Sequence, residues 1–587
     1  MIDDLLIVNA VAMQTSVVGD YVYRVEQPSI AMGKIPGVTV INVSTISPYF
    51  EALCLQADVL ILHLLTEHDL LPIIEERKQK KLATVYEISD NFVAGQSGVG
   101  IKRWFSDPVN VASAFQLIRM ADASQVTGEG ILEKYSFLNS NMVIFENQIS
   151  ELGQYKETTS NSIVIGWAGS SGHTEDLKQI SQTIVDICNK YPNVSFSFMG
   201  DDEQFINIFS CIPESQKTYT PPGTLKDYFR FLEALDIGIA TMIDTPYNHC
   251  RSDIKFVEYA SRGVIPVLSA ITQYKKHAVH GSNAFLFEDN NKLKTILEDL
   301  IQNQTLRQKV ARNTYEYIRS YRMEDQHAKN RIEYYKNLCK KRAVKDNKAF
   351  KLSNLSQASE SFDVEKTETE VLLYKGVTDE ANGNVQSARS LYQKAHELMP
   401  DYYLPLFWLG YSYMRHKENE KAIEFFNRAI EINPRSVRSL LYLGNILESR
   451  EKEKALSVYE TALSVSSSYV PCIEAIALLC EKNRDYSNAA KFYNNALEAN
   501  PFYGNAALGL GRVFTALGNK ENALEAFQVA ADISPSHTES QYKLAECLFE
   551  AGNLEEAANY CLKAMEIDRN YTPTHTLMNK LLKSKLL

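Results

Sequence analysis

The chain lacks the cysteine pattern of a disulfide framework or a zinc site. Its nine cysteines are scattered along 587 residues, and no two of them form a C-x-x-C pair. They are Cys54, Cys188, Cys211, Cys250, Cys339, Cys472, Cys480, Cys547 and Cys561. An odd, unpatterned set indicates reduced thiols, most of them ordinary core residues.

Long hydrophobic runs are also missing. The apolar stretch Leu5–Val8 is too short for a secretion signal, and Asp3 and Asp4 stand where a signal peptide carries basic residues. No uncharged stretch approaches the roughly 20 residues that a membrane-spanning helix needs. The sequence therefore predicts a cytoplasmic protein without a transmembrane segment.

Basic residues are fewer than acidic ones: the chain has 61 Lys and Arg and 72 Asp and Glu, which gives a net charge of −11. An acidic chain gains little from a phosphate backbone, so no nucleic-acid partner is expected. Two nucleotide-binding motifs are absent as well. No G-x-G-x-x-G follows the first predicted strand, which disfavours a nicotinamide or flavin dehydrogenase, and the missing Walker A motif excludes a P-loop NTPase.

The chain does contain an internal repeat in its C-terminal part. Successive units end at positions separated by 34, 33, 34, 34 and 34 residues: Pro400, Pro434, Ser467, Pro501, Pro535 and Arg569. Small residues recur at three fixed places: Gly376, Gly410, Gly444, Ala477, Gly511 and Ala545; Ala388, Ala422, Ala455, Ala489, Ala523 and Ala557; Ala395, Ala429, Ala462, Ala496, Ala530 and Ala564. Between the second and third places stands a large ring: Tyr392, Phe426, Tyr459, Tyr493 and Phe527, with Cys561 in the last unit. Helices that cross closely need small residues where their backbones approach.

Residues 367–569 resemble the tetratricopeptide repeat (TPR) family, whose period is about 34 residues. The resemblance implies six helical pairs stacked as an α-solenoid, with residues 570–587 as a capping helix. It also implies a concave groove that binds a protein or peptide, with a spacer or dimerisation arm as the alternative. The predicted groove residues are Phe407, Trp408, Tyr411, Arg438, Tyr442, Asn445, Arg512 and Tyr542. Rings there would bury side chains of an extended polypeptide, and the polar groups would pair with its backbone.

Before residue 340, short apolar runs alternate with amphipathic segments, which predicts βα units around parallel sheets. The strands expected in the first half are Leu5–Asn9, Val38–Val43, Val59–Leu64, Thr84–Ile88 and Met142–Phe145. Those expected in the second half are Ser162–Trp167, Val194–Met199, Ile237–Ala240, Val264–Leu268 and Ala284–Phe287. The sequence thus predicts an α/β plus all-α chain: Rossmann-like domains at 1–155 and 156–340, a linker at 341–366, and the solenoid at 367–587. A nucleotide would bind in the cleft between the two α/β domains, at the carboxyl ends of the strands.

Two stretches of the second half resemble the retaining glycosyltransferases of the GT-B fold: IVIGWAGSSGHTEDL at 163–177 and TPYNHCRSDIKFVEYASRGVIPVLS at 245–269. The first half matches more loosely, through a G-x-x-x-Y-R loop (Gly19, Tyr23, Arg24), VYEISDN at 85–91 and the stretch VTGEGILEKY. The resemblance covers about residues 1–340. It implies transfer of a hexosyl or N-acetylhexosaminyl group from a nucleotide sugar with retention at the anomeric carbon, with no metal and no cofactor besides the donor. It also implies that the last helices of this region cross back onto the first domain.

A turn of small residues, Gly169, Ser170 and Gly172, precedes a helix expected to begin near His173. Backbone N–H groups at such a turn can hold phosphate oxygens, and the helix dipole adds to this. The alternative is an ordinary tight loop. His173 itself is a predicted contact of the diphosphate.

Residues 251–263 are expected to form a short helix with Ser252 as its N-cap. Arg251 and Lys255 can neutralise the charge that develops on a departing nucleoside diphosphate. Glu258 matches the family glutamate that binds the ribose hydroxyls. The alternative for Lys255 and Glu258 is an exposed helix pair that contributes only a few tenths of a kcal/mol.

Asp90 follows a predicted strand and would face the cleft, where it could orient the acceptor hydroxyl or contact the sugar; a helix N-cap is the alternative. His63 is expected to be a packed strand residue, and Asp201–Asp202 a turn rather than a metal site. The chain departs from the family at Cys250, where many members carry a second glutamate, and at AGSSGH (168–173), where many carry an Arg–Lys pair.

The sequence therefore predicts a glycosyltransferase whose acceptor is a protein recruited by the repeats, a plan similar to that of known TPR-linked glycosyltransferases that modify proteins. One alternative is a surface-polysaccharide enzyme that its repeats dock onto a membrane assembly. The other is a scaffold without catalytic activity, which the departures at Cys250 and 168–173 would favour.

Overall fold

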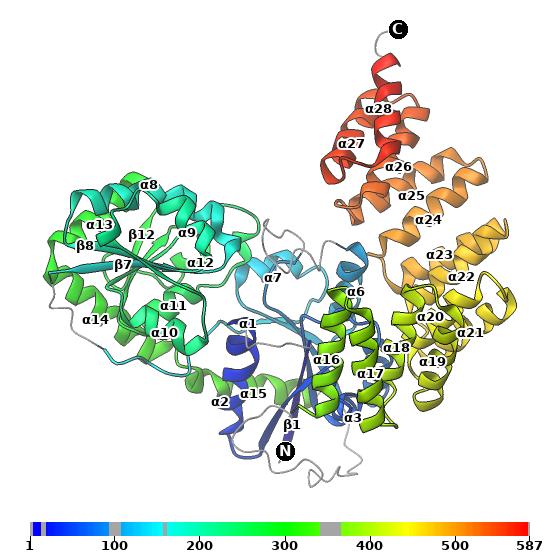
Figure 1. Cartoon of the computed structure of the whole chain (residues 1–587), viewed down its shortest axis with the longest axis horizontal. Helices are drawn as coiled ribbons and strands as arrows, with labels where there is room; N and C mark the ends of the chain where they lie inside the picture. Colours follow the sequence, from blue (N-terminus) through cyan, green and yellow to red (C-terminus); the bar gives the residue numbers. More distant parts are fainter. Residues whose placement is uncertain (1–3, 13–18, 93–106, 156–160, 341–365, 585–587) are drawn as a thin grey trace.

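The computed structural model of the chain describes residues 4–12, 19–92, 107–155, 161–340 and 366–584. Two α/β domains, each built on a parallel sheet, are followed by an array of paired helices (Figure 1). The predicted fold class is confirmed at this level. The predicted linker 341–366 lies, except for Lys366, outside the described residues, and the domain boundaries stay predictions. None of the helices within the described ranges is both long and apolar enough to span a membrane.

The first domain is organised around a parallel sheet with the strand order β2-β1-β3-β4-β5-β6. Its strands are β1 (Leu5–Val11), β2 (Val38–Ser44), β3 (Val59–His63), β4 (Ala83–Ile88), β5 (Ala123–Val126) and β6 (Met142–Ile144). The central strands β3 and β4 are buried along their whole length. Continuous apolar runs of this kind suit a parallel sheet covered by helices on both faces.

The second domain is built on a parallel sheet in the order β12-β11-β10-β7-β8-β9. Its strands are β7 (Ile163–Ala168), β8 (Val194–Met199), β9 (Lys217–Thr220), β10 (Ile237–Ala240), β11 (Ile265–Ser269) and β12 (Phe285–Phe287). The strand order reverses between β7 and β10, as it does between β1 and β3 in the first sheet. In doubly wound sheets the crevice outside such a reversal is where ligands bind.

Two strands escaped the sequence-based prediction because neither is an apolar run. Strand β5 (ASQV) is buried, and its Gln125 donates to Glu87 and accepts from Tyr335, so internal hydrogen bonds satisfy this polar side chain. Strand β9 (KTYT) lies at the edge of the second sheet and is half-exposed. An edge strand with one neighbour needs little apolar surface, so hydrophobicity does not reveal it.

Helices cover both sheets. Those of the first domain are α1 (Gly19–Tyr21), η1 (Val22–Glu26), α2 (Gln27–Gly33), α3 (Phe50–Gln56), α4 (Leu70–Gln79), α6 (Pro108–Met120) and α7 (Glu129–Tyr135). The second domain contributes η2 (Ser171–His173), α8 (Thr174–Lys190), α9 (Asp202–Phe209), η3 (Glu214–Gln216), α10 (Leu225–Glu233), η4 (Asn248–Cys250), α11 (Ile254–Ala260), α12 (Thr272–Lys275), α13 (Asn290–Gln302) and α14 (Gln304–Tyr321). Helix α15 (Glu324–Lys340) then packs Ala328, Ile332 and Tyr335 into the core of the first domain. The predicted return of the chain to the first domain is therefore confirmed.

The C-terminal array consists of successive helical hairpins. Its helices are α16 (Glu368–Ala381), α17 (Val385–Leu398), α18 (Leu404–Arg415), α19 (Asn419–Ile432), α20 (Val437–Leu447), α21 (Lys452–Val465), α22 (Val470–Lys482), α23 (Tyr486–Ala499), α24 (Gly504–Ala516), α25 (Lys520–Ile533), α26 (Thr538–Glu550), α27 (Leu554–Ile567) and α28 (Thr572–Ser584). A Cβ atom added to Gly376 would lie 2.4 Å from the ring of Tyr392, and one added to Gly444 would lie 2.3 Å from Tyr459. The predicted need for a small residue where the two helices cross is thus confirmed in these hairpins, with the ring of the second helix filling the space.

The array packs against the first domain along the turns that precede α18, α20, α22 and α24, which we call the docking edge. Its contacts recur at successive turns: Tyr402 with Ile46, Arg435 with Glu76, Ser468 with Glu75, and Asn500 with Ala112. Apolar side chains of both parts share continuous cores. The last helices, α27 and α28, project away from the α/β domains (Figure 1).

Candidate functional site

The candidate site lies where the carboxyl ends of both sheets meet. Strand β4 ends at Ile88, and Asp90 follows; strand β7 ends at Ala168, and the turn before α8 follows. Helix α11 begins after the loop that leaves β10. Two clusters of polar side chains join the domains here.

The first cluster surrounds Glu258 of α11. Glu258 Oε1 accepts a hydrogen bond from Tyr23 of the first domain at 2.8 Å, and Oε2 accepts from Tyr228 of α10 at 2.6 Å. Lys255 Nζ lies 3.0 Å from Oε2 and donates to the Tyr228 hydroxyl at 2.7 Å. The Lys255 and Glu258 side chains are only 23% and 6% exposed, so they are not an exposed helix pair.

The two tyrosines of this cluster act as hydrogen-bond donors. Burial, reinforced by the Glu258 carboxylate, raises the pKa of Tyr23 and of Tyr228 well above the ordinary value. Both phenols therefore stay protonated and hold the carboxylate in place. Glu258 is thus a fixed, buried acceptor between the two domains.

The second cluster surrounds Arg251. Its Nη1 lies 3.3 Å from Asp90 Oδ2 of the first domain and 2.9 Å from the Tyr247 hydroxyl, which also donates to Asp90 at 3.2 Å. Asp90 therefore faces the cleft. The alternative, a helix N-cap, concerns the segment 93–106, which lies outside the described residues. Burial raises the pKa of Asp90, and the charge of Arg251 opposes that rise.

His173 lies beside Arg251, at the start of α8. Its Nδ1 is 2.8 Å from Asp176 Oδ2, and its Nε2 is 3.5 Å from Arg251 Nη2. Burial lowers the pKa of His173, and Asp176 opposes this. The neutral ring then donates from Nδ1 to Asp176 and keeps the Nε2 lone pair toward the guanidinium.

The predicted phosphate turn is in place, but one of its donors is already used. The Gly169 N–H donates to the Met199 carbonyl at 3.1 Å, so in this structure it is not available to a phosphate. Gly169 is needed for space, because an added Cβ atom would lie 2.6 Å from the Trp167 ring. Ser170 is exposed at this turn, and helix α8 begins at Thr174 as predicted.

The predicted N-cap role of Ser252 is wrong. Helix α11 begins at Ile254, and its N-cap residue is Asp253, whose carboxylate is held by Arg322 at 2.6 and 3.0 Å. The Ser252 hydroxyl instead accepts a hydrogen bond from Asn147 at 2.9 Å. Asp253 makes no side-chain cap hydrogen bond, because its carboxylate pairs with Arg322, the residue that follows α14.

Several side chains at the site were not among the predicted site residues. Tyr23 belonged to a quoted motif, and Arg24 beside it is buried and binds Glu87, Phe145 and Asn147. Tyr247 and Asp176 lie within the two quoted stretches of the second half but were not singled out, and Tyr228 of α10 belongs to no quoted motif. His63 packs in β3 as predicted, and it also lies 3.1 Å from Asp20.

Two of the predicted groove residues, Phe407 and Arg438, are not open to a partner in this structure. Phe407 is 2% exposed, and the Arg438 guanidinium lies 4.7 Å above its ring. Arg438 Nε donates to Asp69, the residue before α4. The prediction that Phe407 and Arg438 line an open groove is therefore wrong, because Arg438 pairs with the first domain and Phe407 is buried beneath it.

The remaining predicted groove residues contact their own array. Trp408 meets Tyr411 edge to face at 5.7 Å, and Tyr411 lies 5.3 Å from Tyr442. Asn445 is exposed and accepts a hydrogen bond from Tyr459 at 2.7 Å. Toward the free end, Arg512 binds Glu481, and Tyr542 donates to Glu546. A role of these residues in partner binding stays a prediction.

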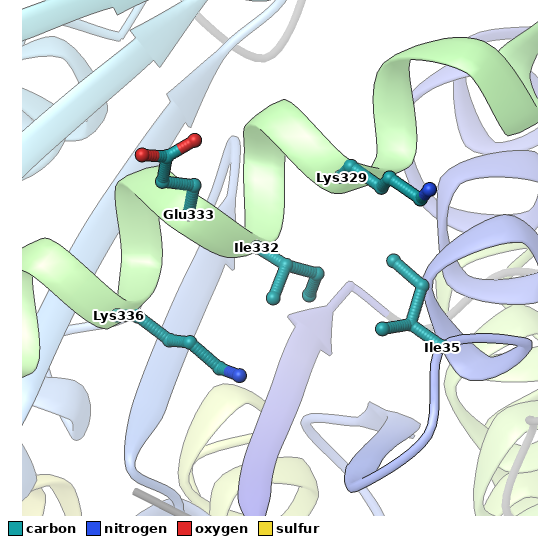
Figure 2. Close-up of a pocket in the computed structure, with 5 residues that line it drawn as sticks. All are labelled: Ile35, Lys329, Ile332, Glu333 and Lys336. Atoms are coloured by element: carbon teal, nitrogen blue, oxygen red, sulfur yellow. The ribbon is translucent and has the colours of Figure 1, made fainter. Parts of the chain in front are cut away.

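A small pocket lies elsewhere, between helix α15 and Ile35 (Figure 2). Lys329, Ile332, Glu333 and Lys336 of α15 complete its lining. None of the predicted site residues belongs to it. In the described part of the chain, no three His, Cys, Asp or Glu side chains are grouped to hold a metal ion.

Family models described as tetratricopeptide repeat match residues 404–436, 475–538 and 521–581, so the C-terminal region contains TPR units. The human cell division cycle protein 16 homolog is 23% identical over 204 residues, which are 32% of this chain and 32% of that protein. A probable UDP-N-acetylglucosamine–peptide N-acetylglucosaminyltransferase SPINDLY of Hordeum vulgare is 27% identical over 150 residues, 24% of this chain and 16% of that protein. The chain thus matches about a third or less of the length of these relatives.

Among solved structures, the Anabaena protein HepE in complex with UDP is 11% identical and has a TM-score of 0.43. The alignment covers 57% of this chain and 100% of that one.

Proposed function

We propose that the chain is a glycosyltransferase that moves a sugar from a nucleoside diphosphate donor to an acceptor. One observation carries this proposal: Arg251 lies beside His173 at the N-terminus of α8, and Lys255 and Glu258 follow on the adjacent helix α11, at the carboxyl ends of the two parallel sheets. Two cations beside a helix N-terminus suit a diphosphate. A fixed carboxylate acceptor next to them suits the hydroxyl groups of a ribose.

In this proposal the protein supplies charge and position rather than a covalent intermediate. Lys255 and Arg251 stabilise the negative charge that grows on the leaving diphosphate as the glycosidic bond breaks. Glu258, held by two tyrosines, accepts the ribose hydroxyls. Asp90 comes from the opposite domain and orients the acceptor hydroxyl. Transfer then proceeds with retention and without a metal.

In the structure these groups bind each other. Lys255 is paired with Glu258, and Arg251 is paired with Asp90. A diphosphate would compete for both cations and free both carboxylates for the ribose and the acceptor. Donor binding is therefore expected to rearrange side chains at the cleft.

We further propose that the acceptor is a protein. The support is the TPR region, because tethering a recruiting module to a cleft raises the local acceptor concentration, to roughly millimolar for short linkers. The name of the barley relative, a peptide N-acetylglucosaminyltransferase, agrees with this plan. Since the docking edge is filled by the first domain, the protein would engage the array away from it, on α25–α28.

The test uses the full-length chain, because removing the repeats would expose the apolar surface that they cover on the first domain. Melting curves are recorded with uridine, guanosine, adenosine and thymidine diphosphate sugars. A donor at 100 times its Kd stabilises by about 2.7 kcal/mol. The active donor should shift the wild type and leave Lys255→Ala unshifted.

Transfer is then assayed with that donor, on protein and on free glycan acceptors. Labelled protein supports the proposed acceptor class, and glycan-only transfer supports a polysaccharide enzyme instead. If no donor shifts the wild type, the chain is a scaffold and the proposed activity is wrong.

A further inference from the structure

A line of packed aromatic rings leads from the docking edge into the first domain. Phe502, in the turn before α24, meets Phe115 of α6 edge to face at 5.0 Å. Phe115 in turn lies 5.9 Å from Phe92, and Phe92 stacks on Tyr135 of α7 at 4.9 Å. Phe92 and Tyr135 are buried, so these rings form a continuous solid contact.

The line ends at the candidate site. The Tyr135 hydroxyl donates to Asn91 Oδ1 at 2.9 Å, and Asn91 Nδ2 donates across the cleft to the Pro246 carbonyl at 3.3 Å. The Asn91 N–H donates to Asp90 Oδ1 at 2.8 Å. Asp90 is thus held from the side of the array by Asn91 and from the second domain by Arg251.

Helix α6 is fixed to the array on both sides of Phe115. Gln116 donates to the Ser468 carbonyl, and Asn500 donates to the Ala112 carbonyl, both at 2.9 Å. Because close-packed interiors transmit displacements rather than absorb them, a shift of the array at these turns would move α6 and the rings behind it.

We infer that the TPR array is a positioning element for the cleft: Phe502, acting through Phe115, Phe92 and Asn91, sets the place of Asp90 opposite Arg251. Its consequence for catalysis rests on the proposed function, whereas the mechanical coupling itself does not. Phe502 is therefore a positioning residue. It lies outside the set of groups that would touch the donor or the acceptor.

The coupling is tested by hydrogen exchange on full-length Phe502→Ala. The expected result is faster amide exchange at residues 86–92, by about two- to tenfold. This factor corresponds to losing the stabilisation that one aromatic pair provides. The control is Phe425→Ala, which removes a ring that stacks on Tyr413 inside the array. The control should leave 86–92 unchanged. If Phe502→Ala changes exchange only at 108–120, the coupling stops at α6 and the inference is wrong.

Donor turnover gives the second test, as a double-mutant cycle with Asp90→Asn. If Phe502 acts through Asp90, Phe502→Ala lowers kcat about two- to tenfold in the wild type, with KM nearly unchanged, and has no further effect in Asp90→Asn. If the two substitutions lower kcat independently, so that the loss in the double variant is the product of the two single losses, the inference is wrong. If neither variant nor wild type turns over a donor, the proposed function fails, while the exchange result still decides the coupling. Phe502→Leu, which keeps apolar volume but removes the ring, replaces Phe502→Ala if that variant does not accumulate.

Discussion

Asp90 and Arg251 are separated by 161 positions in the sequence, yet their side chains lie 3.3 Å apart across the cleft. Each comes from a different α/β domain, so the pair exists only while the domains face one another as they do here. Both side chains are largely enclosed, at 19% and 30% exposure. The pair therefore reports on closure of the cleft as well as on the chemistry proposed for it.

The pH profile of transfer should carry the signature of Asp90. If its ionised form orients the acceptor, activity falls on acidification as the carboxyl is protonated. Because burial raises the pKa of Asp90, this loss should begin at a higher pH than for an exposed aspartate. Asp90→Asn should lower kcat about 10- to 100-fold and abolish this limb of the profile. An unchanged acid limb in Asp90→Asn would assign the titration to another group.

Lys255→Ala should lower turnover by about 100-fold, because it removes a cation from the leaving diphosphate. The control is Lys178→Ala, since Lys178 also pairs with a glutamate three positions away but is exposed, as is Glu175. Steady-state kinetics and circular dichroism compare the two variants. Equal activity of Lys255→Ala and Lys178→Ala at unchanged fold would remove Lys255 from the site.

Gly130→Ala should separate α7 from η4. An added Cβ atom would lie 1.9 Å from the His249 carbonyl oxygen, so the two domains cannot keep their contact. We expect transfer to fall more than tenfold, with a loss of about 1–3 kcal/mol in stability. Gly128→Ala is the matched control, because nothing lies within 4 Å of its Cβ position. Small-angle scattering with and without donor measures closure, and a normally closing Gly130→Ala would contradict the prediction.

Reversing Arg438 to glutamate should weaken the docking edge by about 2 kcal/mol, because it puts two anions together in place of a charge-assisted hydrogen bond. The double variant Arg438→Glu, Asp69→Arg should recover part of the loss. Arg450→Glu disrupts an exposed pair inside the array and should matter little. Docking is measured by the rate of limited proteolysis between the first domain and the array, which should rise when docking weakens. Failure of the double variant to recover would mean that the pair is not what joins them.

Docking should also weaken in acid through His68, which packs edge to face on Tyr469 at 5.8 Å. Burial, helped by Arg438, lowers the pKa of His68 from 6.5 to about 4. On acidification, His68 is therefore protonated more readily in the undocked or unfolded chain than in the docked one. The stability that neutral His68 contributes is complete above pH 6.5 and declines as the pH falls from 6.5 toward 4. The difference in unfolding free energy between wild type and His68→Gln, measured from pH 7 to 4, isolates the effect. A difference that does not change with pH would contradict it.

Much of the fold could be predicted from periodicity alone. Apolar runs marked strands such as β3 and β8, and the 34-residue period marked the helical hairpins. Strand β5 was missed because its stability depends on Gln125, whose bonding partners Glu87 and Tyr335 come from distant segments. A polar strand is visible only once the tertiary partners are known.

The site could be predicted only in part, for a similar reason. Lys255 and Glu258 stand one helical turn apart, so one motif contains both. The tyrosines that hold Glu258 come from η1 and α10, and no spacing in the sequence connects them. The groove was misjudged at Arg438 because repeat patterns describe how a solenoid packs on itself and contain nothing about a neighbour such as Asp69.

The docking edge also has a consequence for biosynthesis. Helices α3, α4 and α6 leave the ribosome early, whereas the turn at Asn500 and Phe502 that covers α6 emerges much later. At a synthesis rate of about 5–20 residues per second, the apolar flank of the first domain stays exposed for on the order of a minute before the repeats that cover it are made. During that interval a nascent chain presents Phe115 and its neighbours to the cytosol or compartment in which it is made, so its yield should depend on translation speed and on chaperones that shield such surfaces.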